Sequence, residues 1–231
     1  MNNLWDSIFK ALSLVVYFDQ SLWEIILVSL RVSLSAILIG LPFALFISYL
    51  LANSNWRFEK LVISINNTLV AVPAVVVGLV IYLLLSRRGL LGDLEWLFTQ
   101  KAMILGQIFL AYPILLSISY SGFKGIAKEA KETAVTLGAN RWQVALTLMF
   151  ETRFILLTAI TTAFGRIIAE VGCAMMVGGN ILHHTRNMTT AIALETNKGE
   201  YSQAIALGIV LLVFAFAINF SIIFFKQKKA I

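Results

Sequence analysis

The sequence predicts an all-α, polytopic transmembrane helical bundle of about five transmembrane helices. Hydrophobic residues make up 59% of the 231 residues and charged residues only 13%, whereas ordinary globular domains carry about a quarter charged residues. Mean hydropathy is +0.87, and several apolar windows reach the roughly 20 residues that a helix needs to cross a bilayer. These windows are continuous and lack the alternation of barrel strands, which favours helices.

The chain, residues 1–231, is interpreted as one transmembrane domain. The first twenty residues carry apolar side chains at helical spacing and form either a short interfacial helix or a partly ordered tail. Pro42, Pro73 and Pro113 each fall inside an apolar window, where a proline kinks or shapes a membrane helix. The first and fourth windows exceed the bilayer thickness, which indicates tilt or extension beyond it. We expect spans at residues 22–52, 61–85, 102–120, 154–177 and 204–225.

Basic residues set the expected orientation, because short loops rich in Lys and Arg stay in the cytoplasm. Five spans put the two termini on opposite sides, and Lys226, Lys228 and Lys229 favour a cytoplasmic C-terminus and an outer N-terminus. On this topology ten basic residues lie inside and six outside, while Arg31 and Arg166 lie within spans. The net charge of +6 then faces anionic membrane lipid and protein partners. Nucleic acid is not needed to explain the charge.

Patterns for catalysis and metal binding are missing from the sequence. There is no G-x-x-x-x-G-K-[ST] phosphate loop, so ATP binding by that mechanism is not expected. Cys173 lies among small residues in a span and is interpreted as a packing residue. His183 and His184 lack cysteine or carboxylate partners at metal-ligand spacing, so solvated loop histidines are expected. We therefore expect no catalytic residue, no metal and no cofactor on this chain.

A polar island at residues 124–153 separates the third and fourth windows. Residues 129–137 are rich in helix formers, Gly138 can take the left-handed conformation that ends a helix, and Asn140 can cap the next helix. The expected arrangement is a short cytoplasmic helix that presents Glu132, a turn, and a return to the membrane. Such a helix suits insertion into a groove of a partner protein, and an ordinary solvated loop helix has the same appearance.

The order Glu132-Thr133-Ala134, three residues and Gly138 resembles the E-A-A-x-x-x-G motif of ATP-binding cassette (ABC) importer permeases. Thr133 replaces the middle alanine, and the I-x-L-P that often follows in the family is absent at residues 148–151. The resemblance implies a type I ABC importer permease of MetI-like fold in a prokaryotic cell membrane. It also implies that residues 124–141 form a coupling helix region, in which Glu132, Ala134 and Gly138 dock on a separate ATPase subunit.

The same resemblance implies a set of partners. Two copies of this chain would form a homodimer around the translocation path. Two ABC ATPase subunits would bind ATP and Mg and hydrolyse the ATP, and their closure would switch the path between inward and outward access. An extracytoplasmic oxyanion-binding protein would dock on the outer loops at residues 86–101 and 179–203.

The last third of the chain indicates the substrate. Residues 165–201 contain E-V-G-C-A-M-M-V-G-G-N-I followed by T-T-A-I-A-L-E-T, and are similar to the corresponding segment of tungstate permeases. Molybdate permeases share a weaker version, so tungstate is ranked first, with molybdate or sulfate as alternatives. An ion-gradient-driven secondary transporter and a membrane scaffold are the other classes. A secondary transporter should show acidic coupling sites within the membrane, and only Glu170 lies deep in a span.

Four polar residues of the fourth span are candidates for the translocation path. Arg166 and Glu170 stand four apart on one helix face, where they form either a structural ion pair or direct contacts along the path. Thr161 and Thr162 either offer hydroxyls to a passing dianion or bond to backbone carbonyls of their own helix.

Gly178, Gly179 and Asn180 are candidates for an outer gate. The two glycines would let the backbone break close to the outer face, and Asn180 can cap the element that follows. Irregular backbone at that depth is tolerated only against protein or water, which favours a position at the gate.

Overall fold

A computed structural model of the chain describes residues 4–17, 19–54 and 56–227. The described residues form nine α-helices and one 3-10 helix and contain no strand, so the predicted all-α class is confirmed. The elements are α1 Leu4–Val16, α2 Gln20–Asn53, α3 Glu59–Val70, α4 Ala74–Leu85, η1 Gly92–Leu94, α5 Gln100–Thr136, α6 Arg141–Ile168, α7 Gly172–Gly178, α8 Met188–Lys198 and α9 Tyr201–Gln227.

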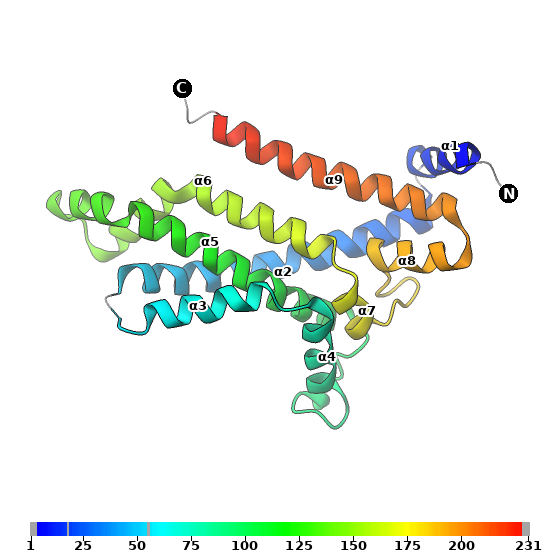
Figure 1. The fold of residues 1–231 in the computed structure, drawn as a ribbon, viewed down its shortest axis with the longest axis horizontal. Helices are drawn as coiled ribbons and strands as arrows, with labels where there is room; N and C mark the ends of the chain where they lie inside the picture. The colour runs from blue at the N-terminus through cyan, green and yellow to red at the C-terminus, as the bar shows by residue number, and fades with distance from the viewer. Residues whose placement is uncertain (1–3, 18, 55, 228–231) are drawn as a thin grey trace.

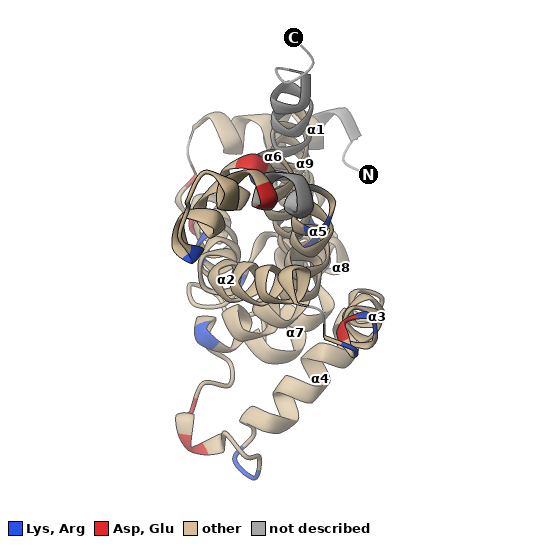
Figure 2. Ribbon diagram, turned by 90° about the vertical axis from the view of Figure 1, so that its left-hand side faces the viewer, with Lys and Arg blue, Asp and Glu red and all other residues tan. Residues whose placement is uncertain are grey.

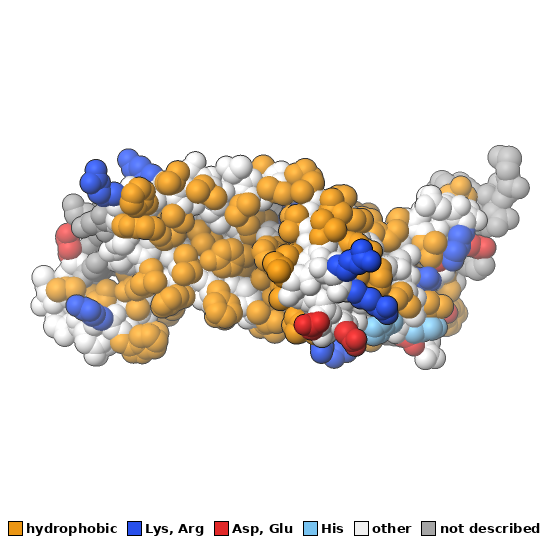
Figure 3. All heavy atoms as spheres, turned by 90° about the horizontal axis from the view of Figure 1, so that it is seen from below, with side chains coloured by type: hydrophobic (Ala, Val, Ile, Leu, Met, Phe, Trp, Pro, Cys, Tyr) orange, Lys and Arg blue, Asp and Glu red, His pale blue; other side chains and the backbone are white. Residues whose placement is uncertain are grey.

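Long helices run along one axis of the molecule. Figure 1 shows α2, α5, α6 and α9 stretched along this axis, with α3 beside α5 and α4 leaving the bundle sideways. By length and composition, α2, residues 100–125 of α5, and α6 can each cross a membrane, and the apolar described part of α9, residues 201–217, is shorter. Figure 3 shows charged side chains at one end of the molecule and over the opposite half, with a mostly hydrophobic stretch between these two groups. This distribution suits a chain that spans a bilayer along its long axis.

The N-terminal residues form a helix that packs on the last one. Ala11 of α1 is fully buried in a cluster with Leu22 and Ile26 of α2 and Leu207 of α9. Of the two interpretations of the first twenty residues, the helix is therefore the correct one for the described part. At the start of α2, Asp19 accepts hydrogen bonds from the Leu22 amide and the Ser21 hydroxyl. The Ser21 hydroxyl contributes most to holding the pKa of Asp19 below its ordinary value.

The predicted span at residues 61–85 is not one continuous helix. The structure divides it into α3 and α4, which meet at an angle of 98°. Pro73 stands at the N-cap of α4 in an extended conformation. Proline has no backbone N–H to continue a helix and it disfavours helical geometry in the residue before it, here Val72. Pro42 and Pro113, by contrast, lie inside α2 and α5.

The predicted span at residues 154–177 is also broken, between α6 and α7 at residues 169–171. The two helix breaks face each other. A methyl group placed on Gly172 of α7 would collide with the Cγ2 atom of Val75 in α4. Gly78 of α4 lies against Cys173, since an added Cβ would be 2.9 Å from the Cys173 Cα. Cys173 is 2% exposed, which confirms its packing role.

We expect Gly78→Ala to destabilise the protein, because the added methyl group must push α7 away from α4. Overpacking of this kind typically costs about 1–3 kcal/mol of unfolding free energy. The matched control is Gly165→Ala in α6, where nothing lies within 4 Å of the new Cβ and alanine favours a helix interior by up to about 1 kcal/mol. Thermal unfolding of the purified protein in detergent measures both. Equal midpoints for the two variants would contradict the close packing of α4 on α7.

Candidate functional site

The predicted coupling region is the turn between α5 and α6. α5 is a single helix of 37 residues, so the expected short helix at 129–137 is the C-terminal end of this long helix rather than a separate element. The turn has the predicted chemistry: Gly138 has a φ of +82°, and Asn140 caps α6. The Asn140 side chain accepts from the Gln143 amide at 2.9 Å, and the Gln143 side chain accepts from the Asn140 amide at 2.8 Å.

The three motif residues have different surroundings at this turn. Glu132 is exposed on the last part of α5. Ala134 is 8% exposed and packs in a cluster with Phe123, Val144 and Leu148. A small residue at 134 therefore lets α5 and α6 approach each other. Of Glu132 and Ala134, only Glu132 is exposed to a partner.

Large apolar side chains are exposed on both sides of the turn at Gly138. Leu137 is 83% exposed, Trp142 is 74% exposed and Val135 is 54% exposed. Exposed apolar groups beside a charge at the end of a bundle are typical of a protein contact surface. We call Glu132, Val135, Leu137 and Trp142 the coupling surface. The last three are not among the predicted site residues, although large apolar residues on both sides of the Gly138 turn were a readable signal.

The Arg166–Glu170 pair exists and holds the break between α6 and α7. Arg166 Nη1 lies 2.7 Å from Glu170 Oε2, and the Gly172 amide donates to Glu170 Oε1 at 2.8 Å. The Thr189 hydroxyl of α8 donates to the Glu170 carbonyl at 2.7 Å. Glu170 is 8% exposed, so both oxygens of a buried carboxylate are engaged by the protein. This geometry favours the structural interpretation of Glu170, while the Arg166 side chain remains 42% exposed.

Thr161 and Thr162 differ in whether the hydroxyl is available to bind an ion. Thr161 donates to the carbonyls of Leu157 at 2.9 Å and Thr158 at 3.2 Å, so its proton is used within α6, as the second of the two interpretations proposes. Thr162 is exposed on the same helix.

Gly178 and Gly179 end α7 against the loop that precedes α5. The Gly178 carbonyl accepts from the Thr185 hydroxyl at 2.5 Å. Gly179 has a φ of +70°, and a Cβ there would be 2.8 Å from the Phe98 ring. The amide of Phe98 also donates to the Val177 carbonyl at 2.9 Å. The two glycines thus allow α7 to pack closely against the loop that precedes α5 and the loop that follows α7.

Asn180 does not cap the next helix, contrary to the prediction. It has a φ of 51°, and the N-cap of α8 is Asn187, whose side chain accepts from the Thr190 amide at 2.9 Å. Six residues separate the two asparagines, because the loop first makes a turn in which the Ile181 amide donates to the Thr185 hydroxyl.

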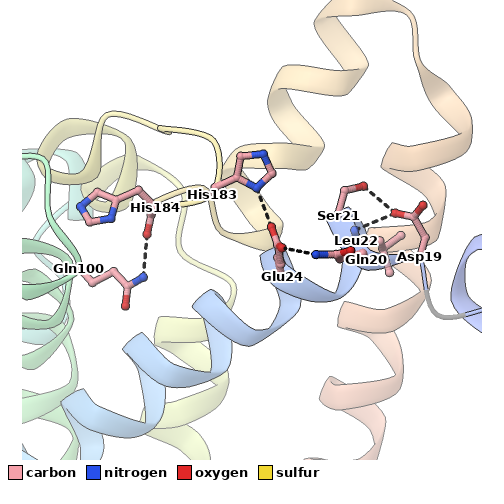
Figure 4. A network of polar contacts seen from close by, with 8 residues as sticks. All are labelled: Asp19, Gln20, Ser21, Leu22, Glu24, Gln100, His183 and His184. Carbon is pink, nitrogen blue, oxygen red and sulfur yellow. Dashed lines mark hydrogen bonds and ion pairs between the residues drawn. The ribbon is translucent and has the colours of Figure 1, made fainter.

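The loop that follows α7 is tied to α2 and α5 by polar contacts (Figure 4). His183 Nδ1 lies 2.6 Å from Glu24 Oε2, and the Gln100 side chain donates to the His184 carbonyl at 2.7 Å. Gln20 donates to the other oxygen of Glu24 at 3.2 Å. Both histidines are exposed, as predicted, but His183 has a carboxylate partner that the sequence does not reveal.

Comparison with known proteins agrees with this arrangement. Residues 23–229 match the family described as the binding-protein-dependent transport system inner membrane component. The tungstate uptake system permease protein TupB of Peptoclostridium acidaminophilum is 40% identical over 219 residues, which cover 95% of this chain and 96% of the relative. TupB of Campylobacter jejuni is 45% identical over 164 residues, covering 71% of this chain and 67% of the relative.

More distant relatives extend the likeness. The molybdenum transport system permease protein ModB of Escherichia coli K12 is 28% identical over 192 residues, covering 79% of this chain and 84% of the relative. The solved structure of the MetNI methionine ABC transporter in inward-facing conformations matches with a TM-score of 0.66 at 15% identity. That match covers 90% of this chain and 94% of the solved chain, and it supports the MetI-like fold. The chain therefore belongs to the family of binding-protein-dependent transport system inner membrane components, the permeases of ABC importers.

Proposed function

We propose that this chain is the permease subunit of an ATP-driven tungstate importer. The observation that carries the proposal is the 40% identity to a tungstate permease along 95% of the chain. The weaker identity of 28% to a molybdenum permease makes molybdate the second candidate. Because the family is that of ABC importers, the ATP-driven class is favoured over the ion-gradient alternative.

The coupling surface is the proposed docking site for a separate ATPase subunit that binds ATP and Mg. An exposed carboxylate on a helix end, flanked by Leu137 and Trp142, offers both a charged and an apolar contact to a groove. The reciprocal cap at Asn140 fixes the start of α6 directly after the end of α5, so a displacement of the ATPase is transmitted to both helices. This is the kind of rigid-body coupling that switches a transporter between two states.

A homodimer and an extracytoplasmic binding protein complete the proposed assembly. In Figure 1 the N-terminus lies at the end opposite the α5–α6 turn, and α9 runs back toward the turn. With the turn in the cytoplasm, the N-terminus lies outside and the C-terminus inside. The loops at residues 86–101 and 179–203 then lie on the outer side as the platform for the binding protein. The Arg166 side chain and Thr162 are the predicted path residues that remain exposed enough to meet the ion.

Uptake by the complete complex tests the substrate. Proteoliposomes with the permease, its ATPase and its binding protein are expected to accumulate tungstate when ATP is supplied on the ATPase side. Molybdate should compete more strongly than sulfate, in line with the order of the relatives. Equal accumulation of sulfate and tungstate at the same concentration would contradict the ranking, and accumulation without ATP would contradict the ATP-driven class.

A further inference from the structure

α3 carries an exposed polar face inside a membrane-length segment. Lys60, Ser64, Asn67 and Thr68 are all exposed, and their spacing of four, three and one residues puts them on one side of a helix. Other exposed positions of α3 are apolar: Leu61 is 55% exposed, Ile65 is 53% exposed and Leu69 is 50% exposed. The helix therefore presents two exposed faces of opposite character.

The polar face borders an open groove between α3 and α5. The groove has a volume of about 490 Å³ and is lined by Lys60, Ile63, Ser64, Asn67, Thr68 and Tyr120. Figure 2, which looks along the long axis, shows α3 at one side of the bundle. α5 adds the Ser117 hydroxyl, which donates to the Asn67 side-chain oxygen at 2.8 Å. Since that bond engages the amide oxygen, the amide nitrogen is the group that Asn67 can offer to the groove.

Charge at the end of the groove favours an anion. The carboxylate of Glu59 is engaged by the Lys124 ammonium at 2.6 Å and by the Tyr120 hydroxyl. Its charge is therefore compensated, and Lys60 adds a positive charge beside it. Further along α3 the groove offers the neutral Asn67 amide and the Ser64 hydroxyl, which bind an ion weakly enough for it to leave again. The Thr68 hydroxyl instead donates to the Ser64 carbonyl at 3.0 Å.

The polar face extends along most of α3. Lys60 stands one residue from the start of α3, and the polar face ends near the break at Ala71–Pro73. The eleven residues from Lys60 to Val70, ten helical rises, cover about 15 Å of helix, or half of a hydrocarbon core. Polar side chains at such depth are stable against water or protein and unfavourable against lipid. Water is favoured over protein as the neighbour of this face. The charge of Glu59 is compensated, Lys60 adds a positive charge and the Asn67 amide is a donor, which suits a water-filled route for an anion.

We propose that the α3–α5 groove is the cytoplasmic half of the oxyanion path, with the Asn67 amide as its main neutral donor and Lys60 at its mouth. The inference rests on the proposed function, because it requires that the chain passes an oxyanion. It assigns the inner path to α3 and α5, away from the Arg166–Glu170 pair.

Thiol labelling tests whether the groove is open to water. In a Cys173→Ala background, single cysteines replace Ser64, Asn67 or Thr68, and Ile65→Cys and Leu69→Cys are the matched controls on the apolar face. Inside-out vesicles that contain the complex with its ATPase are treated with an anionic, membrane-impermeant methanethiosulfonate. We expect labelling at least about tenfold faster at positions 64, 67 and 68 than at 65 and 69. With Asn67→Cys, the anionic reagent should react faster than a cationic one, and Lys60→Gln should reduce this preference.

Uptake measurements complete the test. Asn67→Leu should lower the rate of tungstate uptake by about tenfold or more, the loss expected for one hydrogen bond to an ion, while ATPase recovery stays unchanged. Equal labelling of the two faces would overturn the proposal. So would a disulfide between two copies of the Asn67→Cys variant together with no labelling of that position. Failure of the unsubstituted complex to accumulate any oxyanion would instead overturn the proposed function, so the two failures are distinguishable.

Discussion

Glu132→Arg is expected to abolish recovery of the ATPase subunit with the tagged permease and to reduce ATP-driven uptake to background. Glu132 is exposed at the end of α5, so its replacement leaves the packing of the bundle intact. Reversing the charge places a cation where the partner groove has to accommodate an anion, and like charges across an interface cost several kcal/mol. The measurement is affinity purification from cells that express both subunits, followed by an ATPase assay of the eluate.

The matched control is Glu200→Arg, the same charge reversal at an exposed position between α8 and α9, at the end of the molecule opposite the α5–α6 turn (Figure 1). It should leave ATPase recovery unchanged. Leu137→Ala and Trp142→Ala should each weaken recovery, since interface energy concentrates in a few large apolar and aromatic groups. If Glu132→Arg recovers as much ATPase as the unsubstituted chain, while Trp142→Ala loses it, docking depends on the apolar part of the coupling surface and the role of Glu132 is wrong.

The sequence predicts most of what local chemistry decides. Hydropathy gives the helical class, because a bilayer accepts few other folds. The turn at Gly138 and the cap at Asn140 are readable because each depends on the preference of one residue type for one backbone conformation. The polar island, by contrast, does not reveal that α5 continues to Thr136, since helix formers permit a separate or a continuous helix equally well.

Tertiary contacts decide the features that sequence does not show. Pro73 permits either a kink or a full break, and the 98° angle depends on the packing of α4 against α7. Asn180 and Asn187 are both suitable caps by type, and the position of Thr185 decides between them. The groove residues Ser64, Asn67 and Thr68 stand at helical spacing in the sequence. Their common exposure becomes visible only once α5 is placed beside α3.

Glu170→Ala is the second change for which we expect a large effect. It removes the acceptor of both the Arg166 guanidinium and the Gly172 amide, at a position where lipid cannot replace the lost hydrogen bonds. Leaving a buried polar group unsatisfied costs about 1–3 kcal/mol. We expect a lower thermal midpoint of the purified complex in detergent and loss of uptake, because the break between α6 and α7 is no longer fixed.

Conservative variants separate a structural role from a role in the path. Glu170→Gln keeps an acceptor for the Gly172 amide but loses the charge, and Arg166→Gln leaves the carboxylate without its cation. If the pair is structural, each single variant lowers the thermal midpoint, and the double variant is less unstable than the sum of the two, since the partners are coupled. If Glu170 instead contacts the ion, Glu170→Gln should change the competition between tungstate and sulfate at an unchanged midpoint. The engagement of both carboxylate oxygens leads us to expect the first result, in which Arg166, and not Glu170, can meet the anion.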